Sequence, residues 1–201
     1  METNKVEQYF NSFIEENKLN SSKYKFLIAV SGGIDSITLL SLFIKSKLKF
    51  SVCSSNFNLR GDESKKDIAL VEKICLKNKI KFYSKVFDTK NYSKLNKMSI
   101  QMASRELRYE WFKEIMLKDS YNYLVTAHHS DDNFETIIFN LLKTTGYKGV
   151  IGIPQFGNKI IRPLLNLEKK DILEYAKNEN LVWREDKSNM ENKYLRNLIR
   201  N

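Results

Sequence analysis

The chain has 201 residues, of which 42% are hydrophobic and 12% are aromatic, a composition that is typical of a folded globular domain and excludes a disordered chain. No apolar run is long enough to cross a bilayer, and the charged residues 1–20 lack the apolar stretch of a secretory signal. We therefore expect a cytoplasmic protein with no membrane partner. Cys53 and Cys75 form no CxxC pair, so we expect buried thiols rather than a metal or iron–sulfur site.

The net charge is +10, from 34 basic and 24 acidic residues. Such an excess favours a polyanionic partner such as nucleic acid, because each neutralised phosphate releases counterions. A compositional bias toward Lys, Asn and Ile would explain the same charge. The charge therefore argues for nucleic acid only where the motifs agree with it.

In chain order, short apolar runs alternate with longer segments of helical periodicity up to about Gly146. The runs predict strands at residues 25–30, 50–56, 80–87 and 121–127. The segments between and after them predict four helices, one from Asp35, one at 62–78 with Asp62 as N-cap, one at 99–117 and one at 130–143. The remainder predicts a short strand or hairpin, a helix near 169–178, a polar loop and a terminal helix.

This alternation predicts an α/β fold, with a Rossmann-like parallel sheet, helices on both faces and a short helical C-terminal segment. The reason is that parallel strands need right-handed crossovers, and the crossover helices cover both faces of the sheet. Ligands of such sheets bind outside the carboxyl ends of the strands. We therefore expect the functional residues directly after the predicted strands.

The first such segment is SGGIDS, residues 31–36, between the first strand and an apolar helix. Gly32 and Gly33 let the backbone curl close to a ligand, the helix N-terminus offers unpaired N–H groups, and both serines add hydroxyl donors. A carboxylate at Asp35 repels phosphate unless a cation bridges them, which indicates Mg²⁺. The segment is neither a Walker A nor a GxGxxG sequence. The alternative is an ordinary turn in which Asp35 or Ser36 caps the helix.

The second segment is TAHHSDDNFET, residues 126–136, after the fourth strand, and it holds both histidines of the chain. We expect His128, at the strand end, to approach the mouth formed by SGGIDS. Asp131 and Glu135 lie four apart, on one helix face. One alternative is a capping cluster, with acidic residues in the first helical turn. Another is a zinc site, which would leave SGGIDS unexplained.

The third segment is SRELRYEWF, residues 104–112, in which Arg105 and Arg108 share a helix face. Adjacent guanidinium groups repel unless an anion joins them, and an ATP phosphate or an RNA backbone would serve. The alternative is a solvated face on which Glu106 and Glu110 pair with the arginines.

Together these motifs carry a family resemblance. SGGIDS resembles the SGGxDS motif of the PP-loop ATP pyrophosphatases, which have an adenine nucleotide alpha hydrolase-like fold, adenylate a carbonyl-type oxygen and release pyrophosphate. Residues 126–136 resemble the AHHxDDxxET segment of tRNA(Ile)-lysidine synthases. Residues 104–112 resemble their AR-x-x-RY motif, with Ser104 in place of alanine.

Two further segments extend the resemblance from about Lys25 to Arg200. NFNLRGDESKKD, residues 56–67, resembles the family pattern HVNHGLR-x-x-S, but Asn56 and Asn58 stand where histidines are usual, so only backbone contacts to adenine carry over. IIRPLL, DKSN and RNLIR, within residues 160–200, resemble the family's tail. Arg196 and Arg200 lie four apart, either to contact tRNA phosphates or to complement the helix dipole.

The resemblance implies that ATP adenylates the wobble cytidine of a tRNA(Ile) with a CAU anticodon and that L-lysine then displaces AMP, with Mg²⁺ as cofactor. It assigns ATP binding to Ser31, Gly32, Gly33, Ile34, Asp35, Ser36, Asn56 and Arg105. It assigns catalysis to Asp35 (also the metal ligand), Arg108, His128, Asp132 and Glu135. It assigns tRNA binding to Arg162, Asn189, Arg196 and Arg200.

We expect residues 1–201 to form one domain, with a nucleotide-binding core at 1–150 and a segment at 151–201 that contributes to the tRNA and active sites. A homodimer remains an open option. Two alternative functions also stay open, another PP-loop tRNA-modifying enzyme and a non-catalytic ATP-binding module. The lack of a CxxC pair argues against a thiolase, and the lack of a glutaminase segment argues against an amidotransferase-fed synthetase.

Overall fold

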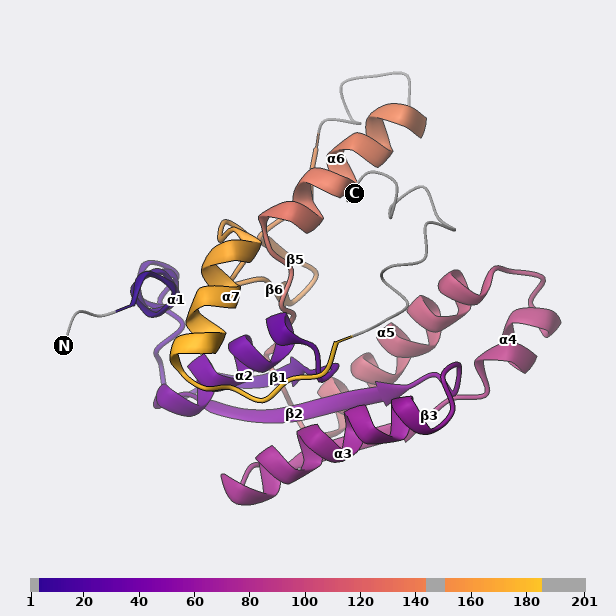
Figure 1. Cartoon of the computed structure of the whole chain (residues 1–201), viewed down its shortest axis with the longest axis horizontal. Helices are drawn as coiled ribbons and strands as arrows, with labels where there is room; N and C mark the ends of the chain where they lie inside the picture. The colour runs from indigo at the N-terminus through magenta and orange to yellow at the C-terminus, as the bar shows by residue number, and fades with distance from the viewer. Residues whose placement is uncertain (1–3, 144–150, 186–201) are drawn as a thin grey trace.

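The computed structural model describes residues 4–143 and 151–185 (Figure 1). Its helices are α1 (Lys5–Glu16), α2 (Ile34–Lys45), α3 (Asp62–Lys77), α4 (Thr89–Leu95), α5 (Ile100–Lys118), α6 (Ser130–Lys143) and α7 (Lys169–Asn178). Its strands are β1 (Lys25–Ala29), β2 (Lys49–Asn56), β3 (Phe82–Val86), β4 (Tyr123–Val125), β5 (Phe156–Gly157) and β6 (Ile160–Ile161). In the part of the chain so described, no helix is long and apolar enough to span a membrane.

The strands form one sheet in the order β3-β2-β1-β4-β6-β5, and every neighbouring pair is parallel except β5 with β6. The predicted α/β fold with a Rossmann-like parallel sheet is confirmed. The chain leaves β1 through α2 toward β2, whereas it leaves β4 through α6 toward β6, on the other side. The carboxyl ends of β1 and β4 therefore flank the point where the strand order reverses, which is where such sheets bind ligands.

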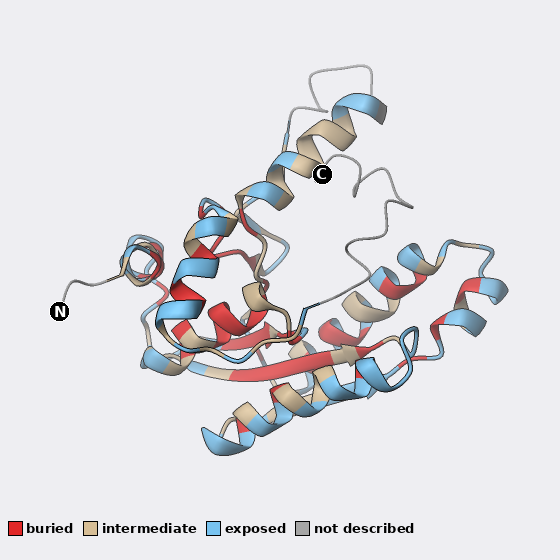
Figure 2. Cartoon of the chain, viewed as in Figure 1, coloured by how far each residue is buried: buried red, intermediate tan, exposed pale blue. Residues whose placement is uncertain are grey.

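The alternation of side chains along the strands builds two cores, one on each face of the sheet. Phe26 and Ile28 point into a cluster completed by α1, α2, α3 and α7. Leu27 and Leu124 point into a second cluster, completed by α5 through Trp111. Figure 2 shows the buried residues concentrated on the strands and on the sheet-facing sides of these helices. Burial on both faces holds the ends of β1 and β4 in place.

The predicted boundaries agree with the structure in most elements, and the exceptions have physical reasons. Asp62 is the first residue of α3 rather than its N-cap, because Gly61, at φ +52°, makes the entry to the helix. Helices α1 and α4 were not predicted. The predicted terminal helix lies outside the described residues.

Candidate active site

The phosphate loop, residues 31–36, curls around the hydroxyl of Ser36. The Ser31 amide donates to Ser36 Oγ at 3.1 Å, and the Ser36 hydroxyl donates to the Gly33 carbonyl at 2.9 Å. Gly32 adopts φ +92°, and a Cβ at this residue would lie 3.3 Å from the carbonyl oxygen of Asp67. Both the backbone angle and the close approach require glycine at this position.

Helix α2 begins at this loop without a side-chain cap. Its N-cap residue is Gly33, and neither Asp35 nor Ser36 caps the helix, so the capping alternative is wrong. The amides of the first turn, which includes Ile34, keep their hydrogen-bonding capacity and the positive end of the helix dipole. This arrangement binds an anion such as a phosphate.

Asp35 lies in the first turn of α2 and faces a cation from a distant part of the chain. The ammonium of Lys169, the first residue of α7, is in direct contact with Asp35 Oδ1. The Asp35 side chain is 29% exposed, so a soluble cation can also reach it. The sequence does not predict a role for Lys169, because its only local feature is its place at the start of a predicted helix.

His129 joins the phosphate loop to the start of α6. Its side chain is only 2% exposed, with Nε2 3.5 Å from Asp132 Oδ2 and 3.8 Å from Asp35 Oδ2. The backbone amide of His129 also donates to Asp132 Oδ2 at 3.1 Å, and Asp131 Oδ1 lies 3.8 Å from Nδ1. Asp132 therefore caps the first turn of α6 and, with Asp35, encloses one imidazole.

His128 points to a different set of groups. Its Nδ1 lies 2.8 Å from the hydroxyl of Thr126. Burial, aided by the charges of Arg162 and Arg105 and opposed by that of Asp132, lowers its pKa to about 4. The ring is neutral at neutral pH as a result. The sequence predicts His128 at the site, whereas the structure brings His129 within 3.8 Å of Asp35.

Two arginines of α5 bring positive charge to the site, and the charge of Arg105 acts on His128. The Arg108 guanidinium lies 4.9 Å from the ring centre of Phe57, and burial together with Arg105 lowers the pKa of Arg108. Arg105 stacks on Tyr109 at 4.9 Å. Within residues 4–143 and 151–185, neither guanidinium has a carboxylate at ion-pairing distance. Aromatic stacking holds these groups in place while leaving their charge available to an anion.

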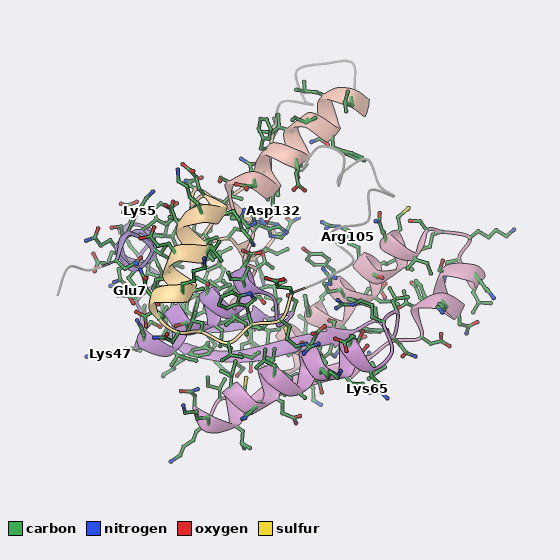
Figure 3. All side chains as sticks on the ribbon, viewed as in Figure 1. Lys5, Glu7, Lys47, Lys65, Arg105 and Asp132 are labelled. Carbon is green, nitrogen blue, oxygen red and sulfur yellow. The ribbon has the colours of Figure 1, made fainter. Side chains whose placement is uncertain are left out.

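Arg105 is exposed, as the alternative of a solvated arginine face requires, but among the described residues the arginines do not pair with the glutamates of their own helix. Glu106 accepts a hydrogen bond from the Tyr92 hydroxyl at 3.1 Å rather than pairing with an arginine of its own helix. Figure 3 shows Arg105 and Asp132 on α5 and α6, the two helices that flank β4 in the chain. Basic and acidic groups thus come from different helices around the same strand.

Arg162 follows β6 directly and lines a cavity of about 540 Å³ between α5 and the β5–β6 hairpin. It is only 8% exposed, and its Nη1 donates to the Pro154 carbonyl at 2.7 Å. Burial and the nearby Arg105 lower the pKa of Arg162. Arg105, Tyr109 and Glu106 line the same cavity, so its lining holds two guanidinium groups against one carboxylate.

The remaining predicted residues are more widely placed. Asn56, at the end of β2, is buried, and its side-chain oxygen accepts the Asn58 amide at 2.8 Å, so it shapes the turn after the strand. Glu135 lies on α6, one turn beyond Asp131, and is half-buried. Asn189, Arg196 and Arg200 lie outside the described residues. In the described part of the chain, no three His, Cys, Asp or Glu side chains converge to hold a metal ion by themselves, so zinc gains no support.

A doubly wound sheet with an uncapped helix and a glycine loop at its switch point defines a nucleotide-binding α/β protein. The chain belongs to the family of PP-loop domains, whose model matches residues 2–201. The predicted family is therefore confirmed, and ATP binding follows from it.

Within curated proteins, the chain is 41% identical over 202 residues to a tRNA(Ile)-lysidine synthase of Chlorobaculum tepidum, covering 98% of this chain and 61% of that protein. It is 36% identical over 195 residues to a tRNA(Ile)-lysidine synthase of Bacteroides thetaiotaomicron, covering 97% of this chain and 46% of that protein. The chain thus spans about half the length of these relatives.

Among solved structures, the U34-tRNA thiolase NcsA of Methanococcus maripaludis superposes with a TM-score of 0.78 at 16% identity, covering 96% of this chain and 70% of that one. An NH3-dependent NAD synthetase of Campylobacter jejuni superposes with a TM-score of 0.63 at 16% identity, covering 88% of this chain and 73% of that one. At such identities the likeness supports the fold alone.

Proposed function

We propose that this chain is the catalytic part of an ATP-dependent tRNA-modifying ligase that adenylates the wobble cytidine of tRNA(Ile) with a CAU anticodon and attaches L-lysine. The observation that carries the proposal is the division of the site. The phosphate loop and the start of α6 supply an acidic side, made of Asp35, Asp131 and Asp132. Helix α5 and the residue after β6 supply a basic side, made of Arg105, Arg108 and Arg162. Two substrates of opposite charge, an ammonium and a polyanion, match these two sides. The identity to curated lysidine synthases supports the same choice.

The phosphates of ATP would lie on the loop, with Ser31, Gly32, Gly33, Ile34 and Ser36 around them. Mg²⁺ fits next to Asp35, because the Lys169 ammonium already occupies a cation position at this carboxylate. Magnesium in such sites takes one or two carboxylates together with substrate phosphates. When bound, it would neutralise charge on the leaving pyrophosphate. Asn56 would shape the loop next to the adenosine.

In the first half-reaction, the C2 oxygen of cytidine bonds to the α-phosphorus of ATP, and the bond from that phosphorus to pyrophosphate breaks. Negative charge moves onto the leaving group and its neighbours. Arg108 is held against Phe57, and Arg105 against Tyr109, without carboxylate partners among the described residues. Preorganised guanidinium groups of this kind stabilise charge that develops in the transition state. The neutral His128 would orient the base through its ring nitrogen.

In the second half-reaction, the lysine amine bonds to C2, the bond from C2 to the oxygen breaks, and AMP leaves. The ammonium must first lose a proton, which a carboxylate can accept. Asp132 and Glu135 lie on the first turns of α6 and are the candidates. Asp132 is the better candidate for accepting this proton, because its carboxylate lies near the phosphate loop. His129 Nε2 is 3.5 Å from Asp132 Oδ2 and 3.8 Å from Asp35 Oδ2.

The tRNA would contact Arg162, which lines the basic cavity, and also Asn189, Arg196 and Arg200. We propose that residues 1–201 act as one domain, with a nucleotide-binding core at 1–150 and a C-terminal segment at 151–201. We propose a cytoplasmic location, because tRNA, lysine and ATP are available together there. A measurement of the molecular mass in solution would test whether the protein forms a homodimer.

The decisive experiment measures ATP-dependent attachment of labelled lysine to an unmodified tRNA(Ile) with a CAU anticodon, together with pyrophosphate release. Both signals are expected for the wild type and are expected to disappear in Asp35→Ala. The matched control is Asp62→Asn, at an exposed carboxylate that pairs only with Lys65 in the described structure.

Each other outcome points to an alternative. Pyrophosphate release without lysine attachment would indicate another PP-loop tRNA-modifying enzyme with a different nucleophile. ATP binding with neither signal would indicate a non-catalytic ATP-binding module. Either result would overturn the lysine-attaching function of this chain.

A further inference from the structure

The segment after α7 runs back across α2 and meets the phosphate loop (Figure 1). Its contact residue is Arg184, whose backbone amide donates to the Gly32 carbonyl at 3.0 Å. This contact joins the loop that follows the first strand to a residue near the end of the described chain. No sequence motif predicted it.

The side chain of Arg184 is fixed on α3. Its Nε donates to Asp67 Oδ1 at 2.7 Å, and its Nη2 pairs with the Glu63 carboxylate. The Asp67 side chain is only 13% exposed and also pairs with Arg60 at 2.7 Å. A guanidinium held by two carboxylates has little freedom to rotate. The backbone amide of Arg184 is therefore held where the Gly32 carbonyl needs it.

Asp67 of α3 also lies directly against the phosphate loop. The carbonyl oxygen of Asp67 lies where a Cβ of Gly32 would approach within 3.3 Å. Gly32 is thus enclosed by Asp67 on one side and by the Arg184 amide on the other. Because Gly32 has φ +92°, its peptide unit has alternative orientations, and rotation would redirect the Gly33 amide that follows.

The segment is also anchored on its other side. Trp183 and Leu181 pack against the main core, and the Leu181 amide donates to the Ala176 carbonyl of α7 at 2.9 Å. At the other end of α7, Lys169 pairs with Asp35. One rigid helix and its following segment therefore touch the phosphate loop at two residues.

We propose that Arg184 is a positioning residue, which fixes the Gly32 peptide in the orientation that binds the nucleotide phosphates. It acts through Asp67 and Glu63 and touches no substrate. The proposal rests on the proposed function only in that the loop binds ATP. Under this proposal, the affinity for nucleotide depends on the position of residues 179–185, which follow α7.

The test compares Arg184→Met with wild type in two measurements without tRNA or lysine. Calorimetry with Mg²⁺ and α,β-methylene ATP, which cannot release pyrophosphate, gives nucleotide affinity. Hydrogen exchange gives the protection of the Gly32 and Gly33 amides. We expect about tenfold weaker binding and faster exchange at both glycines, a size typical of coupling between sites. The matched control is Lys66→Met, which removes a cation from the same Glu63 carboxylate but does not touch the loop.

A double-mutant comparison distinguishes the positioning role of Arg184 from a purely structural role. If Arg184 acts through Asp67, then Arg184→Met combined with Asp67→Asn weakens nucleotide binding no more than the stronger single change. Additive losses, or affinity and glycine exchange within twofold of wild type, would overturn the proposal. Should Arg184→Met not fold, Arg184→Lys supplies the test, because it keeps the charge and loses the two-point contact. If the wild-type protein binds no nucleotide, the proposed function is wrong. The hydrogen-exchange data at Gly32 and Gly33 still decide whether Arg184 positions the loop.

Discussion

The two sides of the site differ in charge and in how their side chains are held. The acidic side, defined by Asp35, Asp131 and Asp132, surrounds His129 and meets the ammonium of Lys169. The basic side, defined by Arg105, Arg108 and Arg162, is held by aromatic rings and a backbone carbonyl. The acidic side thus has one ammonium of the protein against three carboxylates, whereas the basic side is arranged to receive an anion. This polarity orders the two substrates of the proposed reaction.

Two consecutive histidines divide between these sides. His129 contacts the acidic side, whereas the charges acting on His128 come from both sides, from Asp132 and from Arg162 and Arg105. They lie three and four residues beyond Val125, the last residue of β4, and their side chains contact different groups. The pair therefore marks the boundary between the acidic and the basic side, and substitutions on either side should have different consequences.

The largest effect is expected on the acidic side. Asp35→Asn removes the charge that faces both Lys169 and the proposed magnesium, and we expect lysine attachment to fall by about three orders of magnitude or more. Initial rates of labelled lysine incorporation measure this. Comparable loss in Asp62→Asn would show a general effect of removing a carboxylate and would contradict the assignment.

Arg108→Met is expected to have the next largest effect, on the basic side. Loss of a preorganised guanidinium next to developing charge should lower kcat about 100-fold while KM for ATP changes little. Steady-state pyrophosphate release at varied ATP checks both constants. Lys113→Met, on an exposed position of the same helix, is the matched control. A rise in KM alone would instead assign Arg108 to ground-state binding.

The parts of the acidic and basic sides that could be predicted from the sequence are those formed by residues close together in the chain. The phosphate loop was predictable, because strand, glycines and helix are adjacent in sequence. The choice between His128 and His129 was not, because the phase of two residues after a three-residue strand is not encoded in periodicity. Lys169 and Asp35 are 134 residues apart, and Arg184 and Asp67 are 117 apart, so only the packing of α7 reveals them. Asn189, Arg196 and Arg200 stay predictions.

The fold divides in the same way. The parallel sheet followed from short apolar runs that bury both faces, as in β1. Helix α1 also carried a readable signal, since Val6, Phe10 and Phe13 recur at helical spacing and are all buried. Helix α4 has only seven residues, and its buried residues are Thr89 and Ser93, so no apolar periodicity marks it.

The pH dependence of stability is the third way to test the comparison. Burial holds the folded pKa of His128 near 4, below its ordinary value of 6.5, so between these values the unfolded state binds more protons. Stability contributed by the neutral ring is therefore present above pH 6.5 and lost as pH falls toward 4, by up to about 3 kcal/mol. Denaturant unfolding of wild type and His128→Gln over this range measures the difference. Equal slopes with pH would show that His128 titrates normally and is not buried between the two sides.

The smallest effect is expected for Lys169→Met. The ion pair with Asp35 is partly exposed, at 40% and 29% of the two side chains, so its loss should lower the free energy of unfolding by no more than about 1 kcal/mol. Removing the ammonium leaves Asp35 free for a soluble cation, so Mg²⁺ should bind several-fold more tightly in the absence of nucleotide. Calorimetric titration with Mg²⁺ measures this, and Lys170→Met, which removes the cation of an exposed pair with Glu168, is the matched control. Weaker Mg²⁺ binding in Lys169→Met would mean that Lys169 orients Asp35 for the metal rather than competing with the metal for this carboxylate. The acidic side would then bind Mg²⁺ only with the Lys169 ammonium in place.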